Sequence, residues 1–278
     1  MGVNDAPPWL GADFTRTARE AGASAPAAAV DLAAARLLDR WCDPRRRFHN
    51  IRHLVGVLTR VDELAAETHA PALVRLAAFY HGAVFDSPLP APGRPGADHR
   101  LPGRQTAGHG AAEPEGAVAC AAALEVPPGA NWENEAASAE VAREELAGLG
   151  IDSAAVERVA TLIRTLADQR ALPKDTDSAV LTDAALGMLA VEPQRYEEYV
   201  RAVRAENETV PAAAFFEARI SAIEGLLERP ALFGSPGAKA WERSARDNLS
   251  AELNRDRKAL VKADLDAECK ARAAADPG

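Results

Sequence analysis

The segment 48–67, FHNIRHLVGVLTRVDELAAE, sets the fold that we expect for this chain. His49 and His53 are four residues apart, so a helix would place both imidazoles on one face. The nearly all-apolar segment 72–85, ALVRLAAFYHGAVF, follows it and carries His81. Three histidines on two neighbouring helices are typical of a metal site built between helices.

The composition of the whole chain predicts an all-α protein. Its 278 residues are 47% hydrophobic but only 5% aromatic. Much of the apolar content is alanine, a strong helix former. No alternating run of β-branched residues is long enough to indicate a sheet. A chain of this length can also bury a substantial core.

We expect one helical domain over residues 25–250. A flexible arm with one short helix is expected before it, over residues 1–24. A charged tail that frays is expected after it, over residues 251–278. Residues 88–129 hold 8 prolines and 7 glycines, which is typical of a loop or disordered excursion within the domain.

Charge and cysteine content exclude several classes of function. The net charge of −9 leaves no basic surplus, so there is no strong signal for nucleic acid or an anionic membrane. The arginines at 45–47 are typical of a solvated charge run. Three widely spaced cysteines fit a reducing compartment, and no apolar run approaches the length of a membrane span. We therefore expect a cytoplasmic protein without a membrane segment.

Six short motifs resemble, in order and spacing, those of bacterial proteins described as predicted metal-dependent phosphohydrolases of the HD superfamily. The chain reads FHNIRH at 48–53, YHGAVFD at 80–86, NEAASA at 134–139, DAAL at 183–186, YEEYVRAVRAE at 196–206 and ARDNL at 245–249. The similarity extends over roughly residues 40–250, apart from a longer Gly/Pro-rich stretch. It implies a single HD-domain-like helical bundle and hydrolysis of a phosphoester or nucleotide.

The resemblance also implies a metal site, but one that lacks two carboxylates. His53 and His81 match two metal ligands, and Asp183, two residues before the position of the distal ligand, is a partial replacement for it. Gly82 stands where the family has its paired aspartate, and Ala185 stands at the distal position. Hard cations depend on oxygen donors, whereas a softer ion such as zinc can use imidazoles. The expected cofactor is a divalent metal (Zn, Fe or Mn) or none.

For several further residues we expect a functional role, and for some of them an ordinary structural role is the alternative. His49 is a further ligand or a base, and Asp86, one helical turn beyond the missing aspartate, is a substitute for it. Glu135 is an acid that steadies a bound water or a histidine, or only a favourable charge at a helix N-terminus. Arg164 and Arg204 are candidate phosphate contacts, or arginines with solvent or a salt bridge.

Two functions follow from this pattern. The first is a divergent phosphohydrolase-like enzyme that acts on a small phosphorylated ligand through the histidine site. The second is a catalytically inactive HD-fold pseudoenzyme that binds a small ligand or a partner protein. The first function requires a bound transition metal, and the second requires only a folded bundle without metal. The oligomeric state is left open.

Overall fold

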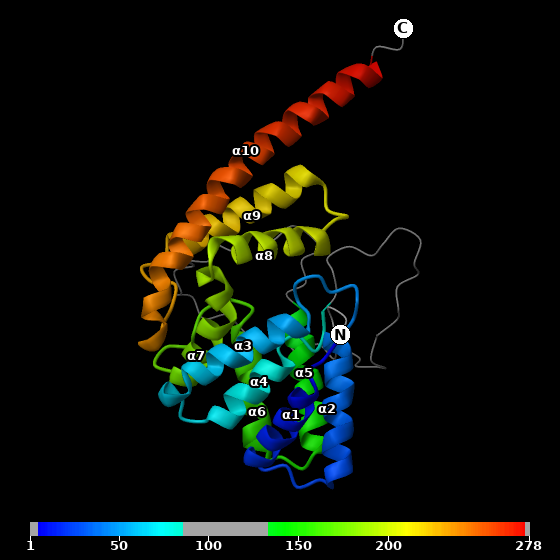
Figure 1. The fold of residues 1–278 in the computed structure, drawn as a ribbon, viewed down its shortest axis with the longest axis vertical. Coiled ribbons are helices and arrows are strands. Elements are labelled where there is room, and N and C mark those ends of the chain that lie inside the picture. Colours follow the sequence, from blue (N-terminus) through cyan, green and yellow to red (C-terminus); the bar gives the residue numbers. More distant parts are fainter. Residues whose placement is uncertain (1–4, 86–132, 276–278) are drawn as a thin grey trace, which may run out of the picture.

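A computed structural model describes residues 5–85 and 133–275, and within these ranges the chain forms helices and no strands (Figure 1). The all-α prediction is confirmed. Asp86 and the excursion expected at 88–129 lie outside the described residues. The α-helices are α1 (Pro8–Glu20), α2 (Ala27–Trp41), α3 (Ile51–Glu63), α4 (Pro71–Tyr80), α5 (Glu133–Gly148), α6 (Ser153–Thr165), α7 (Thr176–Leu186), α8 (Pro193–Glu206), α9 (Ala212–Leu227) and α10 (Glu242–Ala275). Short 3₁₀ helices are η1 (Ala65–Glu67), η2 (Gly187–Ala190) and η3 (Gly237–Trp241).

Local sequence explains where several helices begin. The side chain of Asn50 accepts a hydrogen bond from the backbone of Arg52 and caps α3. Asp152 and Asp175 cap α6 and α7 in the same way. Such caps satisfy backbone N–H groups that have no partner within the helix. Helices α4 and α8 instead begin with proline, which needs no such partner.

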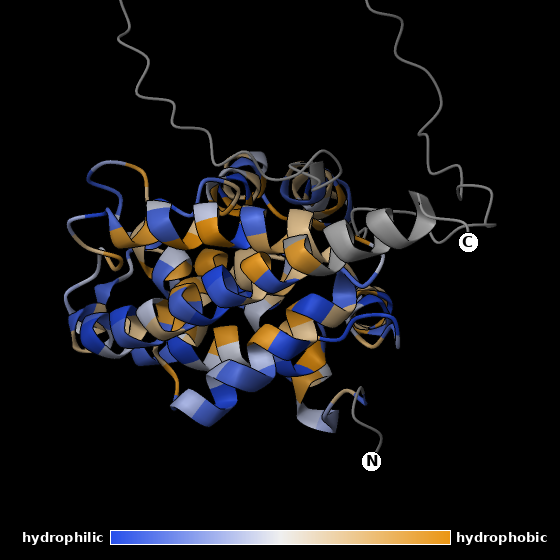
Figure 2. Ribbon diagram, turned by 90° about the horizontal axis from the view of Figure 1, so that it is seen from above, coloured by the Kyte–Doolittle hydropathy of each residue, from blue (hydrophilic) through white to orange (hydrophobic). Residues whose placement is uncertain are grey.

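Helix α4 lies at the centre of the core. All seven of its residues from 74 to 80 are buried. It contacts α1, α3, α5, α6 and α7, so it is surrounded by other helices. Figure 2 shows apolar and polar residues interleaved along the surrounding helices, as expected when each buries one stripe against the core. Helix α4 thus has the central position that its apolar sequence predicted. His81, which directly follows α4, lies at the edge of the core.

The N-terminal region is not the flexible arm that we expected. Residues 8–20 form α1, which packs on α2 and α4. Leu10 and Phe14 are fully buried, and the Phe14 ring meets Phe79 edge to face with 5.3 Å between centroids. The expectation is wrong for residues 8–20 because the apolar stripe of this helix completes one side of the core.

The charged tail expected from residue 251 does not begin there. Helix α10 is continuous from Glu242 to Ala275 and packs on α9. Glu252, Leu253 and Asp256 are buried, so the domain boundary predicted at 250 falls inside a packed part of the helix. Figure 1 shows that the last turns of α10 extend away from the other helices. None of the helices in the described ranges combines the length and the apolar character that a membrane crossing requires.

Candidate functional site

The structure brings the three predicted histidines together; we call His49, His53 and His81 the histidine cluster. The Nε2 atoms of His53 and His81 are 3.2 Å apart. The ring centroids of His49 and His53 are separated by 5.5 Å. His49 lies just before the N-cap of α3 and is therefore not helical, but its ring still faces the same side as His53. The two segments do bring these side chains together, but the expectation that one helix carries both His49 and His53 is wrong, because α3 begins only at Ile51.

Burial keeps His53 and His81 neutral near pH 7. Burial lowers the pKa of His81 to about 4 and that of His53 well below its ordinary value. The Nδ1 atom of His81 lies 2.6 Å from the carbonyl oxygen of Ala78. Because a carbonyl only accepts, this nitrogen carries the proton and donates. The Nε2 atom of His81 is therefore left with a lone pair that faces His53.

An indole ring occupies the space beside Gly82. A Cβ atom at residue 82 would overlap the ring of Trp41, with 2.8 Å to Cζ2 and 2.9 Å to Cζ3. Trp41 is fully buried, and its Nε1 atom donates to the carbonyl oxygen of Phe79 at 2.9 Å. Its ring centroid is 5.1 Å from that of His81. The position expected of an aspartate is thus closed by an aromatic side chain that packs on the histidine.

The buried guanidinium of Arg46 lies next to Trp41 and Gly82. Arg46 is only 6% exposed, although the arginine run at 45–47 predicted a solvated charge. Its Nη1 atom donates to the carbonyl oxygen of Gly82 at 2.6 Å, and its guanidinium lies over the ring of Trp41. Burial lowers the pKa of Arg46 to about 10, so the group stays charged at neutral pH. A positive charge here disfavours a second cation.

Glu206, at the C-terminal end of α8, holds His49. Its Oε2 atom is 2.8 Å from Nδ1 of His49, and Oε1 accepts from the backbone N–H groups of Phe48 and His49. Burial acts to raise the pKa of Glu206, but the hydrogen bonds and charge of His49 lower it overall. Sequence reasoning did not single out Glu206. Its signal was its place as the last residue of the motif at 196–206.

The other predicted acidic residues take separate positions. Glu135 is half-buried on α5, burial raises its pKa, and the charge of His49 acts on it in the opposite sense. Asp183 is buried on α7 and accepts hydrogen bonds from the backbone of Gly234 at 2.9 Å and of Ser235 at 2.7 Å, and from the Ser235 hydroxyl. Asp183, predicted as a metal ligand, instead holds the turn before η3.

The two arginines predicted to contact phosphate already have partners within the protein. Arg164 pairs with Glu140 at 2.8 Å on the surface. Arg204 donates to the carbonyl oxygens of Asn207 and Val210. Its guanidinium also lies 4.8 Å from the ring centroid of Phe215. Arg204 therefore closes the turn after α8, and Arg164 joins α6 to α5.

We asked whether the residues present fit a hydrolytic metal. In residues 5–85 and 133–275, no group of three or more histidine, cysteine or acidic side chains is arranged to hold a metal ion. The two opposed imidazoles supply nitrogen donors, yet Trp41 and Arg46 take the place of an oxygen donor. Hydrolytic metals need such ligands together with an open position. The described donor set does not fit one.

No family model, curated protein or solved structure matches the chain. The likeness to HD-type phosphohydrolases therefore rests on the six motifs and stays a prediction.

Proposed function

We propose that the chain is a catalytically inactive protein with an HD-type fold that binds a small phosphorylated ligand and does not hydrolyse it. One observation carries the proposal. The ring of Trp41 fills the space beside Gly82, where the resemblance expects a metal-binding aspartate. A hydrolytic metal has to be held, polarise a phosphoryl oxygen and activate water. Neither an indole ring nor a guanidinium supplies a ligand for that ion.

Contacts between distant motifs support the HD-type fold. His49 belongs to the motif at 48–53 and Glu206 to the motif at 196–206, yet their side chains are hydrogen-bonded. His53 and His81, from the first two motifs, are also in contact. Motifs that converge on one site are expected when they derive from a common functional site. This convergence supports the resemblance without depending on a metal.

The local charge supports an anionic ligand over a cation. Carboxylates that would hold a cation are missing at positions 82 and 185. His53 and His81 are neutral because burial lowers their pKa values, and Arg46 adds a positive charge. The Glu206 carboxylate is already hydrogen-bonded to His49, so Arg46 remains as the charge that disfavours a cation here.

Metal analysis combined with a phosphatase assay tests this proposal. We expect no bound zinc, iron or manganese in the purified protein, also after incubation with each ion, and no hydrolysis of p-nitrophenyl phosphate. About one equivalent of metal that is lost in both His53→Ala and His81→Ala would contradict the proposal. His69→Ala is the matched control, because His69 is exposed and lies outside the cluster.

A zinc-dependent phosphohydrolase is the second candidate, and one observation favours it. Two nitrogen ligands on a tetrahedral zinc are separated by about 3.4 Å, since each Zn–N bond is about 2.0–2.1 Å long. The Nε2 atoms of His53 and His81 are 3.2 Å apart. The hydrogen bond from His81 to Ala78 also fixes the tautomer that a ligand needs. The same metal analysis decides between the two functions.

A further inference from the structure

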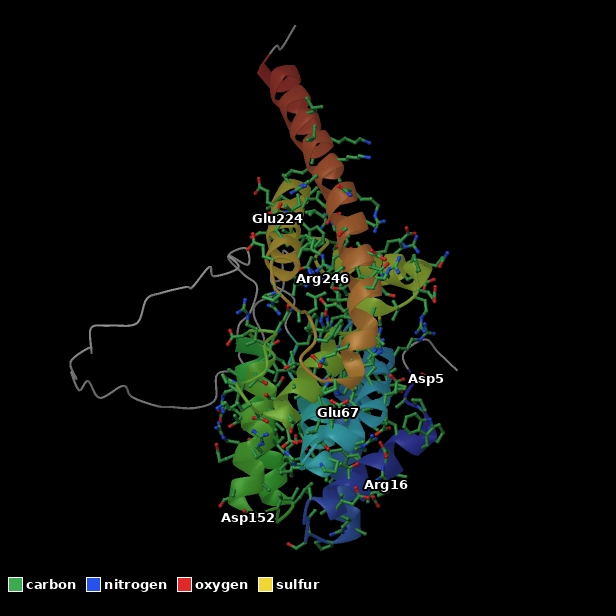
Figure 3. The ribbon with its side chains drawn as sticks, turned by 90° about the vertical axis from the view of Figure 1, so that its left-hand side faces the viewer. Asp5, Arg16, Glu67, Asp152, Glu224 and Arg246 are labelled. Carbon is green, nitrogen blue, oxygen red and sulfur yellow. The ribbon has the colours of Figure 1, made fainter. Side chains whose placement is uncertain are left out.

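A cavity of about 640 Å³ lies along α3, between this helix, the start of α8 and the segment before α1. Arg52 and Arg60 of α3 and Arg195 of α8 line it. Asp5, which Figure 3 labels, lines it from the N-terminal segment. We call this space the arginine cavity. Its remaining lining consists of Pro7, Ile51, Val55, Gly56, Thr59 and Glu63.

Arg60 is seated between two glycines. Its Nη1 atom donates to the carbonyl oxygen of Gly56 at 3.0 Å. A Cβ atom on Gly187 of η2 would overlap Cδ and Nε of Arg60 and would lie 3.3 Å from Cζ. The absence of side chains at these two positions therefore makes room for the guanidinium. Arg60 is half-buried as a result, and burial lowers its pKa.

None of these three arginines forms an ion pair with a carboxylate in the part of the chain that the structure describes. Arg219, which is also half-buried, is by contrast bound to Glu252 at 2.6 Å. Asp5 and Glu63 line the arginine cavity as well, so three positive charges face two negative ones. Arg60 is half-buried, whereas Arg52 and Arg195 are exposed. One positive charge is left in excess, and a bound anion would compensate it.

We propose that the arginine cavity binds a small organic phosphate. Guanidinium groups present paired donors that match phosphate oxygens, and Arg52, Arg60 and Arg195 supply three of them around one space. Pro7, Ile51 and Val55 supply an apolar wall for the organic part. The volume falls within the range of small-molecule sites. This inference rests on the proposed ligand-binding function and assigns the ligand to a place outside the histidine cluster.

Calorimetric titration of the full chain with ATP and with pyrophosphate tests the inference. We expect binding to at least one of these probes at low salt, with a dissociation constant that rises with ionic strength. Arg60→Gln and Arg195→Gln should each weaken binding by at least about 10-fold, because each removes charge-assisted hydrogen bonds. Arg201→Gln is the matched control: Arg201 is exposed on the same helix as Arg195 and does not line the cavity.

Gly187→Ala tests the geometry without removing a charge. The new methyl group would displace Arg60, so binding should weaken by about 10-fold while the melting temperature shows that the protein is still folded. Two results would overturn the inference: no binding of either probe up to about 10 mM, or equal binding in wild type and the arginine variants. No binding of either probe would also count against the ligand-binding part of the proposed function, whereas binding that the arginine variants leave unchanged would overturn only the assignment to this cavity. Neither result bears on metal content or phosphatase activity, which test the absence of hydrolysis separately.

Discussion

The histidine cluster and the arginine cavity both use residues of α3, and they differ in how their charged groups are satisfied. In the cluster, His49 is bound to Glu206, His81 to Ala78, and Arg46 to the carbonyl oxygen of Gly82. In the cavity, three guanidinium groups have no carboxylate partner among the described residues. The residues whose pattern suggests catalysis thus hold the fold together. Arg52, Arg60 and Arg195, for which the sequence predicted no role, line an open cavity.

This difference has an energetic meaning. Buried groups with partners contribute to stability, and removing one member leaves another unsatisfied. Charged groups without a carboxylate partner, such as the exposed Arg52 and Arg195, contribute little to stability and are free to serve a ligand. Substitutions in the cluster should therefore change the free energy of unfolding, whereas substitutions in the cavity should change ligand affinity. The following predictions test that separation, from the largest expected effect to the smallest.

Trp41→Ala should have the largest effect on stability. The indole is fully buried, packs on His81 and donates to Phe79, so its loss leaves a cavity and an unpaired carbonyl group. We expect the free energy of unfolding to fall by about 3–5 kcal/mol, measured by urea denaturation followed by circular dichroism. Trp9→Ala is the control, because Trp9 is 51% exposed and should cost less than about 0.5 kcal/mol. Equal losses of unfolding free energy in the two variants would show that the packing of Trp41 in the histidine cluster does not contribute to stability as proposed.

Acid should destabilise the protein through the histidine cluster. The pKa of His81 is about 4 in the folded protein and near 6.5 when unfolded, so between these values only the unfolded chain binds the proton. Stability should therefore fall as the pH drops from about 6.5 toward 4, by about 3 kcal/mol for this group. His81→Gln should flatten the unfolding free energy measured against pH, and His69→Gln should leave the slope unchanged.

Gly82→Asp should not restore a metal site. The new side chain would collide with the ring of Trp41, so we expect a loss of about 1–3 kcal/mol and no bound metal. In the double variant Trp41→Ala/Gly82→Asp the collision is gone. Its loss of stability should be smaller than the sum of the two single losses. Strict additivity in this double-mutant cycle would show that the ring and residue 82 do not share the space.

Arg60→Met should have the smallest effect on stability. The guanidinium has no carboxylate partner among the described residues, and methionine can keep the apolar contacts of its stem. We expect a change within about 0.5 kcal/mol together with loss of ATP or pyrophosphate binding. Arg219→Met is the contrasting control and should cost about 3–5 kcal/mol, because it leaves the buried carboxylate of Glu252 unpaired. A large loss of stability in Arg60→Met would mean that this arginine is structural.

Part of the candidate site could be predicted, and the reason is local. The spacing of His49 and His53 and the apolar run before His81 placed three histidines on adjacent elements, and the structure has them in contact. The partner of His49 could not be predicted in the same way. Glu206 lies 157 residues further along the chain, and only the packing of α8 near the start of α3 brings it there.

Expectations about single charged residues were less successful. Asp183, predicted as a metal ligand, holds a turn through the backbone of residues 234 and 235. Arg46, expected in solvent, is buried, and Arg204, expected near a phosphate, is bound to carbonyl oxygens. A charged residue type indicates which chemistry is available. The surrounding helices decide whether that chemistry is used for a ligand or for the fold.

The sequence by itself determined the helices, the apolar stripes that build the core and the pairing of the histidine-bearing segments, because helical periodicity and capping are properties of neighbouring residues. Only the tertiary structure decided that the indole of Trp41 fills the space beside Gly82 and that two glycines seat Arg60 at an open cavity. Both depend on which surfaces of distant helices meet. Packing in a close-packed interior is a property of the whole fold and not of any segment.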